Sequence, residues 1–303
     1  MLDLNEVVLE ALDLHSSYDL PTLDLPSEGK RIVIASGNAL PTGRIIYADE
    51  DAIFANESQY LRVLEKYPDI LNATVISASG GKHAPAAVRD MLQRGIKTTL
   101  LTCNRESQAA GLLPSEAVIV TRARVEPITY NTSTYLGMIL AKTDEKPSTI
   151  KDHILSNVQS LIPDLSTYKA FFLLVHSKFE IEREMFVTKF DELFGGRLLG
   201  RCYTPEQTLH AKTVVPWEHE LFISFGFENE YFGDDRLTIP LPPDANFGAM
   251  LSVGYYVIGR IQAQFPAWFK ANAAAYELLQ SQLFERFREP NLGQTGSRSF
   301  TEG

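Results

Sequence analysis

The chain has 303 residues, a net charge of −10 and a pI near 5.2, which argues against the basic face of a nucleic-acid-binding protein. Hydrophobic residues make up 45% and charged residues 22% of it, the balance of a globular protein with a sizeable core. An acidic protein can still carry one locally positive pocket, so a small anionic substrate is compatible with this charge.

Two cysteines, Cys103 and Cys202, are too few and too far apart for a disulfide framework or a metal cluster. We therefore expect a reduced, cytoplasmic protein. The opening residues 1–14 are acidic and lack the basic region of a signal peptide. No apolar run approaches the ~18 residues that span a bilayer, so we expect no membrane partner.

The first half of the chain alternates β-rich runs with helical patterns. An amphipathic helix is predicted around Leu4 to Leu12, before a break at Pro21, Pro26 and Gly29. The strands predicted after it are 31–36, 52–55, 73–79, 97–103 and 117–121. The helices predicted among them are 58–66, 85–93 and one that begins near Thr132. This alternation favours βαβ units and a parallel sheet with helices on both faces.

The second half repeats this rhythm after Lys142–Thr149, a charged segment with a proline that reads as a linker. Helices are predicted at 151–161, 181–193, 249–264 and 266–287, and strands at 169–175, 197–202, 220–226 and 236–242. We predict an α/β protein of two domains, 1–145 and 146–289, each a parallel sheet flanked by helices on both faces. A flexible polar tail is expected at 290–303.

The stretch Ser77-Ala78-Ser79-Gly80-Gly81 ends a predicted buried strand. Ligands bind at the carboxyl ends of strands in open parallel sheets, and glycines let the backbone approach an anion closely. Serine hydroxyls add donors, and Lys82 adds positive charge. These parts predict a phosphate site, in which His83 either contacts the substrate or faces solvent. The equally weighted alternative is a turn whose serines cap the next helix.

A second group of candidates lies between 189 and 210. Lys189 and Glu192 are three apart on a predicted helix and share a face, and His210 follows in a turn. A carboxylate suits proton transfer between neighbouring carbons, and a histidine suits proton traffic near neutral pH. The alternatives are an exposed ion pair and a structural histidine.

The Ser-x-Ser-Gly stretch resembles the phosphate loop of the sugar isomerase (SIS) domain. The resemblance implies that Ser77, Ser79 and the amides of Gly80 and Gly81 hold the phosphate of a phosphosugar. The segment VEPITYNTSTYLGMILA is similar to a family segment in which a glutamate precedes a hydroxyl cluster that opens a helix. This likeness adds Thr132 and Ser133 as phosphate contacts, with a plain helix cap as the alternative.

The chain also departs from the SIS pattern. Lys82 and Ala84 stand where the family usually has threonine and glutamate. The early loop 36–43 keeps only Gly37, and Thr42 is a candidate to replace its serine.

The 189–210 segment resembles the second SIS domain of tandem phosphosugar isomerases, with Lys189-x-x-Glu192 followed by Glu206 and His210. The resemblance implies a cofactor-independent aldose–ketose isomerase of a hexose or aminosugar phosphate, working as a homodimer. Glu192 would be the base, His210 would assist ring opening, and Lys189 would help electrostatically. The alternatives are a non-catalytic phosphosugar-binding protein and an aminosugar-phosphate deaminase or deglycase of the same fold.

Overall fold

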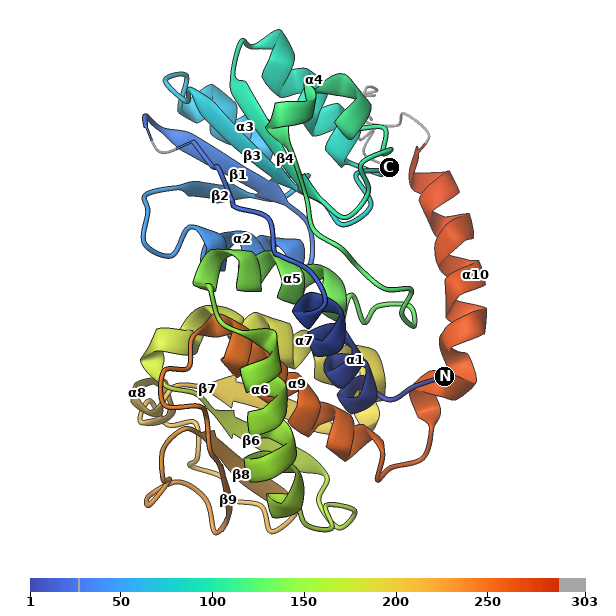
Figure 1. The fold of residues 1–303 in the computed structure, drawn as a ribbon. Coiled ribbons are helices and arrows are strands. Elements are labelled where there is room, and N and C mark those ends of the chain that lie inside the picture. The colour runs from blue at the N-terminus through green and yellow to red at the C-terminus, as the bar shows by residue number, and fades with distance from the viewer. Residues whose placement is uncertain (27, 289–303) are drawn as a thin grey trace, which may run out of the picture.

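The computed structural model describes residues 1–26 and 28–288, which form two parallel β-sheets with a layer of helices between them (Figure 1). The predicted parallel-sheet α/β class is therefore confirmed. The tail predicted at 290–303 lies outside the described residues. In the described ranges, no helix is both long enough and apolar enough to cross a lipid bilayer.

The first sheet has five strands in the order β2-β1-β3-β4-β5, all parallel. Its strands are β1 (Arg31–Ala35), β2 (Ile53–Ala55), β3 (Asn72–Ile76), β4 (Lys97–Thr102) and β5 (Val118–Val120). β1 and β3 are buried at every position. Such continuous burial is typical of parallel strands that are covered on both faces.

Five α-helices accompany this sheet: α1 (Leu4–Ser16), α2 (Ala39–Ile46), α3 (Tyr60–Lys66), α4 (Ala84–Gln93) and α5 (Thr132–Thr143). Two short 3₁₀ turns, η1 (Ala110–Leu112) and η2 (Ser115–Ala117), precede β5. α3 and α4 pack on one face of the sheet, and α1, α2 and α5 contribute to the core on the other face. The first half thus has helices on both faces, as predicted.

The second sheet has four parallel strands in the order β7-β6-β8-β9. Its strands are β6 (Ala170–Leu174), β7 (Leu199–Tyr203), β8 (Glu220–Phe225) and β9 (Asp235–Ile239). Its helices are α6 (Pro147–His153), α7 (Arg183–Phe194), α8 (Pro205–Thr208), α9 (Phe247–Gln262) and α10 (Trp268–Arg288). Shorter turns are η3 (Ile154–Val158, a π-helical turn), η4 (Gln159–Leu161), η5 (Ser177–Glu182) and η6 (Gly195–Arg197).

The prediction of helices on both faces is wrong for the second sheet, because no described helix packs on its outer face. Phe172 and Phe222 stack there with ring centroids 4.7 Å apart, in a cluster that also includes Leu174. The cluster is completed by strand and loop residues, and none of the described helices contributes to it. The chain passes from β8 to the parallel strand β9 through the loop 226–234, which contains no described helix. The alternation of predicted strands and helices does not indicate that helices are missing from the outer face of this sheet.

A continuous apolar core joins the two sheets through α1, α5 and α9. The leading helix α1 packs closely on α9: a Cβ added to Gly259 would lie 2.0 Å from the backbone nitrogen of Asn5. The Leu4 amide also donates to the Gln262 side chain at 2.9 Å. The N-terminal helix, predicted as part of the first domain, therefore contacts the second half as well.

The predicted linker Lys142–Thr149 is largely helical, because α5 and α6 occupy its two ends and only residues 144–146 connect them. α5 runs to Thr143, and Pro147 begins α6, where its missing N–H costs nothing. The Glu145 carboxylate accepts hydrogen bonds from three backbone amides at the start of α9, at 2.7–3.1 Å. Glu145 of this charged connection therefore caps the start of α9.

Candidate active site

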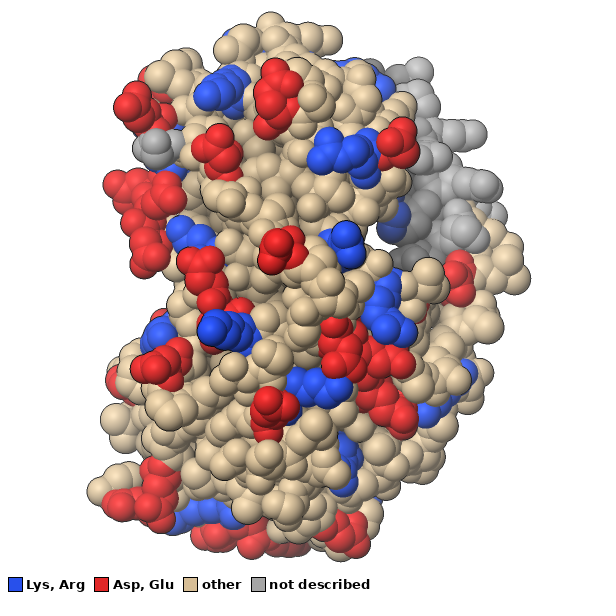
Figure 2. Space-filling model, viewed as in Figure 1, with Lys and Arg blue, Asp and Glu red and all other residues tan. Residues whose placement is uncertain are grey.

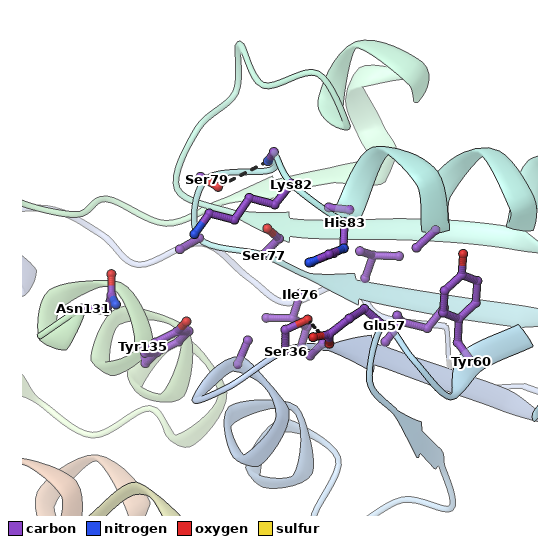
Figure 3. A pocket seen from close by; sticks show the side chains of 18 residues that line it. Ser36, Glu57, Tyr60, Ile76, Ser77, Ser79, Lys82, His83, Asn131 and Tyr135 are labelled. Atoms are coloured by element: carbon purple, nitrogen blue, oxygen red, sulfur yellow. Dashed lines mark hydrogen bonds between the residues drawn. The ribbon is translucent and has the colours of Figure 1, made fainter. Parts of the chain in front are cut away.

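The Ser-Gly loop lines a cavity of about 320 Å³ at the carboxyl edge of the first sheet (Figure 3). Ser77, Ser79, Gly81, Lys82 and His83 contribute one wall of it. The N-terminus of α4 also lies at this wall, since Ala84 and Ala87 are lining residues. The loop and helix end thus form the kind of concave surface that binds anions through backbone amides.

The conformation of the loop depends on Gly80. This residue has a φ of +58°, and an added Cβ would lie 2.1 Å from the Ser107 hydroxyl oxygen. The Ala109 amide donates to the Gly80 carbonyl at 3.0 Å, which fixes the 104–111 segment against the loop. By contrast, a Cβ on Gly81 would meet only the Ser79 hydroxyl, at 3.6 Å. Glycine is therefore required at position 80 and not at position 81.

The alternative interpretation, that the serines cap α4, does not fit the structure. His83 occupies the N-cap of α4, and no side chain caps this end. The Ser79 hydroxyl instead accepts from the Gly81 amide at 3.3 Å, within the loop. In the part of the chain that the structure describes, no hydrogen bond engages the Ser77 hydroxyl, which faces the cavity.

Five further residues with polar groups line the cavity and were not predicted: Ser36, Glu57, Tyr60, Asn131 and Tyr135. Ser36 follows β1 and donates to the carboxylate of Glu57, which follows β2 (Figure 3). The signal available in the sequence was their position after the first two predicted strands, since adjacent parallel strands end at one edge. The cavity is consequently mixed in charge: Lys82 lies on one side and Glu57 on the other.

Three hydroxyl residues named from the sequence do not line the cavity. Thr42 is buried and donates to the Asn38 carbonyl within its own helix, so it does not replace the missing serine. Thr132 and Ser133 are also buried. Their amides donate to the Glu126 carboxylate at 2.5 and 2.7 Å. Glu126 therefore caps the start of α5, and burial raises its pKa.

Lys189 and Glu192 form an ion pair on α7, with the lysine buried and the carboxylate half-buried. The Lys189 side chain is fully buried, and its Nζ donates to Glu192 Oε2 at 2.6 Å and to the Thr129 carbonyl at 2.7 Å. The Tyr255 ring lies beneath the ammonium, with its centroid 5.5 Å away. The exposed ion pair considered as an alternative is excluded, because this lysine has no access to water.

Burial acts on both partners of the pair. It raises the pKa of the Glu192 carboxyl and lowers the pKa of the Lys189 ammonium, and the attraction between the two groups opposes both changes. A carboxylate whose pKa is raised toward neutrality is a stronger base than an exposed one.

Glu192 opens onto a second cavity of about 550 Å³. Segments from both halves of the chain line it: Ile128 and Thr129 before α5, Asp191 to Gly195 at the end of α7, and residues of α10. Thr129 lines this second cavity and Asn131 lines the first, so the two cavities flank one short stretch of chain. Both residues have positive φ, +73° and +47°, which is uncommon outside glycine.

His210 does not approach Glu192 within one chain. Glu192 lies just before β7 begins, whereas the exposed His210 follows the end of β7. The five residues of β7 separate the two by roughly 13 Å along the strand. The segment around His210 also exposes four large apolar side chains: Leu209, Val214, Val215 and Trp217.

Acidic and basic side chains are interspersed on the face of the molecule shown in Figure 2, and its coloured residues form no continuous basic patch. Within the described ranges, no group of three or more histidine, cysteine and acidic residues is placed to hold a metal ion.

The arrangement of two parallel sheets joined by a helical layer is shared with solved structures of a phosphosugar isomerase and of a glucosamine-6-phosphate deaminase. Solved structures with this fold confirm the resemblance at the level of the fold. Glucosamine-6-phosphate deaminase from Thermotoga maritima is 15% identical with a TM-score of 0.61, over 86% of this chain and 91% of that one.

Two further structures are similar. Tagatose-6-phosphate ketose/aldose isomerase from Escherichia coli is 12% identical with a TM-score of 0.58, over 87% of this chain and 89% of that one. The C-terminal domain of glucosamine-fructose-6-phosphate aminotransferase from Francisella tularensis is 12% identical with a TM-score of 0.54, over 86% of this chain and 93% of that one. No model of a known protein family and no curated protein sequence matches the chain.

Proposed function

We propose that the chain binds a phosphosugar and interconverts its aldose and ketose forms without a cofactor, acting on a hexose or aminosugar phosphate. The observation that carries this proposal is the pair of the buried Lys189 and the partly exposed Glu192, which is anchored to the loop that borders the Ser-Gly cavity. A half-buried carboxylate stabilised by one ammonium, beside a cavity lined by hydroxyls and a lysine, supports proton transfer on a phosphorylated substrate.

In this proposal the phosphate lies at the Ser-Gly loop. The hydroxyls of Ser77 and Ser79, the amides at the start of α4 and the charge of Lys82 hold it there. The resemblance implied the amides of Gly80 and Gly81, but these already donate within the loop, to the Ser77 carbonyl at 3.2 Å and to the Ser79 hydroxyl at 3.3 Å. The open-chain sugar then extends past Asn131 and Thr129, so that its carbonyl end reaches Glu192. Thr132 and Ser133 act indirectly, because they are held by Glu126 and keep the start of α5 in position.

Glu192 takes the proton from one carbon next to the carbonyl group and returns it to the neighbouring carbon through an enediol. Lys189 keeps the carboxylate ionised and oriented, since the two atoms are 2.6 Å apart in a buried site. Ring opening requires a further acid–base group. We assign it to His210 of the partner subunit in a homodimer. The exposed apolar side chains of the 209–217 segment support an interface there.

The test is incubation of the purified chain with aldose and ketose 6-phosphates in D₂O, followed by NMR. We expect interconversion together with deuterium incorporation next to the carbonyl carbon. Size-exclusion chromatography with light scattering should show a dimer, and His210→Ala should lower the rate with cyclic but less with open-chain substrates. Binding without interconversion or deuterium incorporation would overturn the assignment as an isomerase.

A second candidate is a non-catalytic phosphosugar-binding protein. The distance of His210 from Glu192 and the carboxylate of Glu57 inside the first cavity favour it. Sugar phosphates would then raise the melting temperature without any deuterium exchange. A third outcome, release of ammonia or an amine from an aminosugar phosphate, would identify a deaminase or deglycase.

A further inference from the structure

Residues 127–130 form a tight turn just before α5. The Tyr130 amide donates to the Pro127 carbonyl at 3.2 Å, which closes a β-turn with Ile128 and Thr129 at its two central positions. Thr129, at the second of these positions, has a φ of +73°. A turn with positive φ there is normally built with glycine or asparagine, because a Cβ disfavours the left-handed conformation. Threonine, which is branched at Cβ, is a poor choice for the backbone alone.

Contacts from the second half of the chain hold the turn in this strained conformation. The Lys189 ammonium donates to the Thr129 carbonyl at 2.7 Å. The next residue, Tyr130, is fully buried. Its ring stacks on Phe269 with the centroids 5.2 Å apart, and its hydroxyl forms hydrogen bonds with the Gln262 side chain. A strained residue that persists because its surroundings fix it points to a functional constraint.

The Thr129 side chain lies beside the carboxylate of Glu192. Both residues line the second cavity. Burial raises the pKa of the Glu192 carboxyl, whereas Lys189 and the Thr129 side chain lower it. The Thr129 hydroxyl oxygen is buried, and among the described residues it has no hydrogen bond of standard geometry. A buried hydroxyl without such a partner is uncommon. Hydrogen bonds of catalytic groups are often poorly aligned before the substrate binds and tighten in the complex.

We infer that Thr129 is a positioning residue for Glu192: its hydroxyl donates to the carboxylate in the substrate complex, while its carbonyl holds Lys189. One residue of the first half thereby orients both members of the ion pair on α7. The inference rests on the proposed function, in which Glu192 is the base. It explains why a threonine occupies a turn position at which glycine would be less strained.

The expected effect is on the protonation of Glu192. Other charged or titratable groups surround the ion pair: Lys189 and Asp191 on α7, Glu126 before α5, Tyr135 on α5, Tyr255 on α9, and Arg197 and Tyr276 in the lining of the second cavity. Because a hydrogen-bond donor favours the ionised carboxylate, removal of the Thr129 hydroxyl should raise the pKa of Glu192 while these groups stay in place. The acid limb of the pH profile of deuterium exchange then moves to higher pH.

The test compares Thr129→Val, which keeps the shape and loses the hydroxyl, with Thr129→Ser, which keeps the hydroxyl. In Thr129→Val we expect kcat to fall roughly tenfold with a nearly unchanged KM for fructose 6-phosphate, since one hydrogen bond to a charged group is lost away from the phosphate. Thr129→Ser should restore most of the rate and the native acid limb. Thr188→Val is the matched control, because Thr188 lines the same cavity, and it should leave the acid limb unchanged.

A readout that needs no turnover is the titration of Glu192 itself, followed by NMR of the chain labelled with ¹³C at the glutamate carboxyl carbons. The Glu192 signal is the one missing from the spectrum of Glu192→Gln. We expect the pKa of Glu192 to be higher in Thr129→Val and in Thr129→Gly than in the native chain. Thr129→Gly also removes the strain, so it should melt at a higher temperature than Thr129→Val, and it tests the hydroxyl if the valine variant does not fold.

An acid limb and a Glu192 pKa that stay native in both Thr129→Val and Thr129→Gly would overturn the inference. A shift of the same size in Thr188→Val would also overturn it. If the native chain exchanges no deuterium with any sugar phosphate, the proposed function fails, while the NMR titration still decides whether Thr129 acts on Glu192. The two failures are therefore distinguishable.

Discussion

The first four strands of each half are arranged in the same order across their sheets. The second strand lies at the edge, and the first, third and fourth strands follow it in that order. The loops after their third strands differ. After β3 the chain forms the Ser-Gly loop and the ten-residue helix α4. After β8 the chain forms the loop 226–234, and no described helix lies between β8 and β9. Here Asn229 organises the loop by accepting from the Tyr231 and Phe232 amides at 3.3 and 3.0 Å.

This difference explains two properties of the halves together. A helix after the third strand covers the outer face of the sheet and also directs its N-terminal amides at the carboxyl edge. The first half has both the cover and the Ser-Gly cavity. The second half has neither at this position, and contributes α7 with Lys189 and Glu192 instead. In the account proposed here, one half binds the phosphate and the other performs the chemistry.

Glu192→Gln tests the chemical half and should have the largest effect. Removal of a general base typically costs about 10²–10⁴ in rate, so we expect a loss of that size in deuterium exchange, with phosphosugar affinity nearly unchanged. Glu184→Gln is the control, because Glu184 lies exposed on the same helix and only pairs with Arg44 at 3.2 Å. Exchange at the native rate in Glu192→Gln would contradict the division of roles.

Gly80→Ala tests the binding half. The residue would have to adopt a positive φ and displace Ser107, which we expect to cost about 1–3 kcal/mol of stability and to abolish phosphosugar binding. Gly81→Ala should leave the stability nearly intact, because its Cβ would meet only the Ser79 hydroxyl, at 3.6 Å. Gly233→Ala in the other loop should also lower stability, because its Cβ would lie 2.0 Å from the Phe222 ring. Its affinity for phosphosugar should not change, and thermal melting with and without ligand distinguishes these cases.

The buried side chain of Glu182 fills the carboxyl edge of the second sheet, and substitution of this residue tests that edge. Neither of its carboxyl oxygens has a hydrogen-bond partner among the described residues. Burial raises its pKa well above the ordinary value, the charge of Glu145 adds to this, and Lys178 opposes it. Cys202 and Tyr255 are the other titratable groups near it.

Because folding raises the pKa of Glu182, the contribution of its protonated form to stability is complete below the unfolded pKa and is lost as the pH rises through the folded pKa. Above the folded pKa, each unit by which the folded pKa exceeds the unfolded pKa costs about 1.4 kcal/mol of folding stability. Glu182→Gln should therefore melt at a higher temperature than the native chain at pH 8, and the gap should close toward pH 4. A constant gap across this range would show that ionisation is not the cause.

Lys82→Met should have the smallest effect. The Lys82 side chain is exposed enough for solvent to screen it, although burial lowers the pKa of its ammonium. We expect at most about a tenfold loss of phosphosugar affinity and a weaker dependence of affinity on salt. Arg89→Met, an exposed position on α4 outside the cavity, should leave the affinity and its salt dependence unchanged. An equal loss of phosphosugar affinity in both variants would contradict a specific role for Lys82.

The sequence predicts most of the fold because the strands are short runs of β-branched and aromatic residues. The strands predicted at 31–36 and 220–226 are found at Arg31–Ala35 and Glu220–Phe225. Prediction from the sequence fails where contacts between distant residues determine the local structure. The segment 142–149 reads as a linker by composition, yet Glu145 is held by amides a hundred residues away.

The candidate site shows the same limit. Ser77, Ser79 and Lys82 were predicted from one contiguous stretch with a turn and a helix start. Ser36 and Glu57 were not, since only the order of the strands brings them to the same cavity. The second cavity beside Glu192 depends on where α10 packs, which no local pattern encodes.

A crystal structure of the chain with fructose 6-phosphate bound tests the division of roles most directly. We predict the phosphate at the Ser77 and Ser79 hydroxyls and the start of α4, with the carbon that loses its proton about 3–3.5 Å from a carboxylate oxygen of Glu192. A phosphate bound elsewhere, or a sugar directed from the Ser-Gly loop toward Glu57 and away from Glu192, would contradict it.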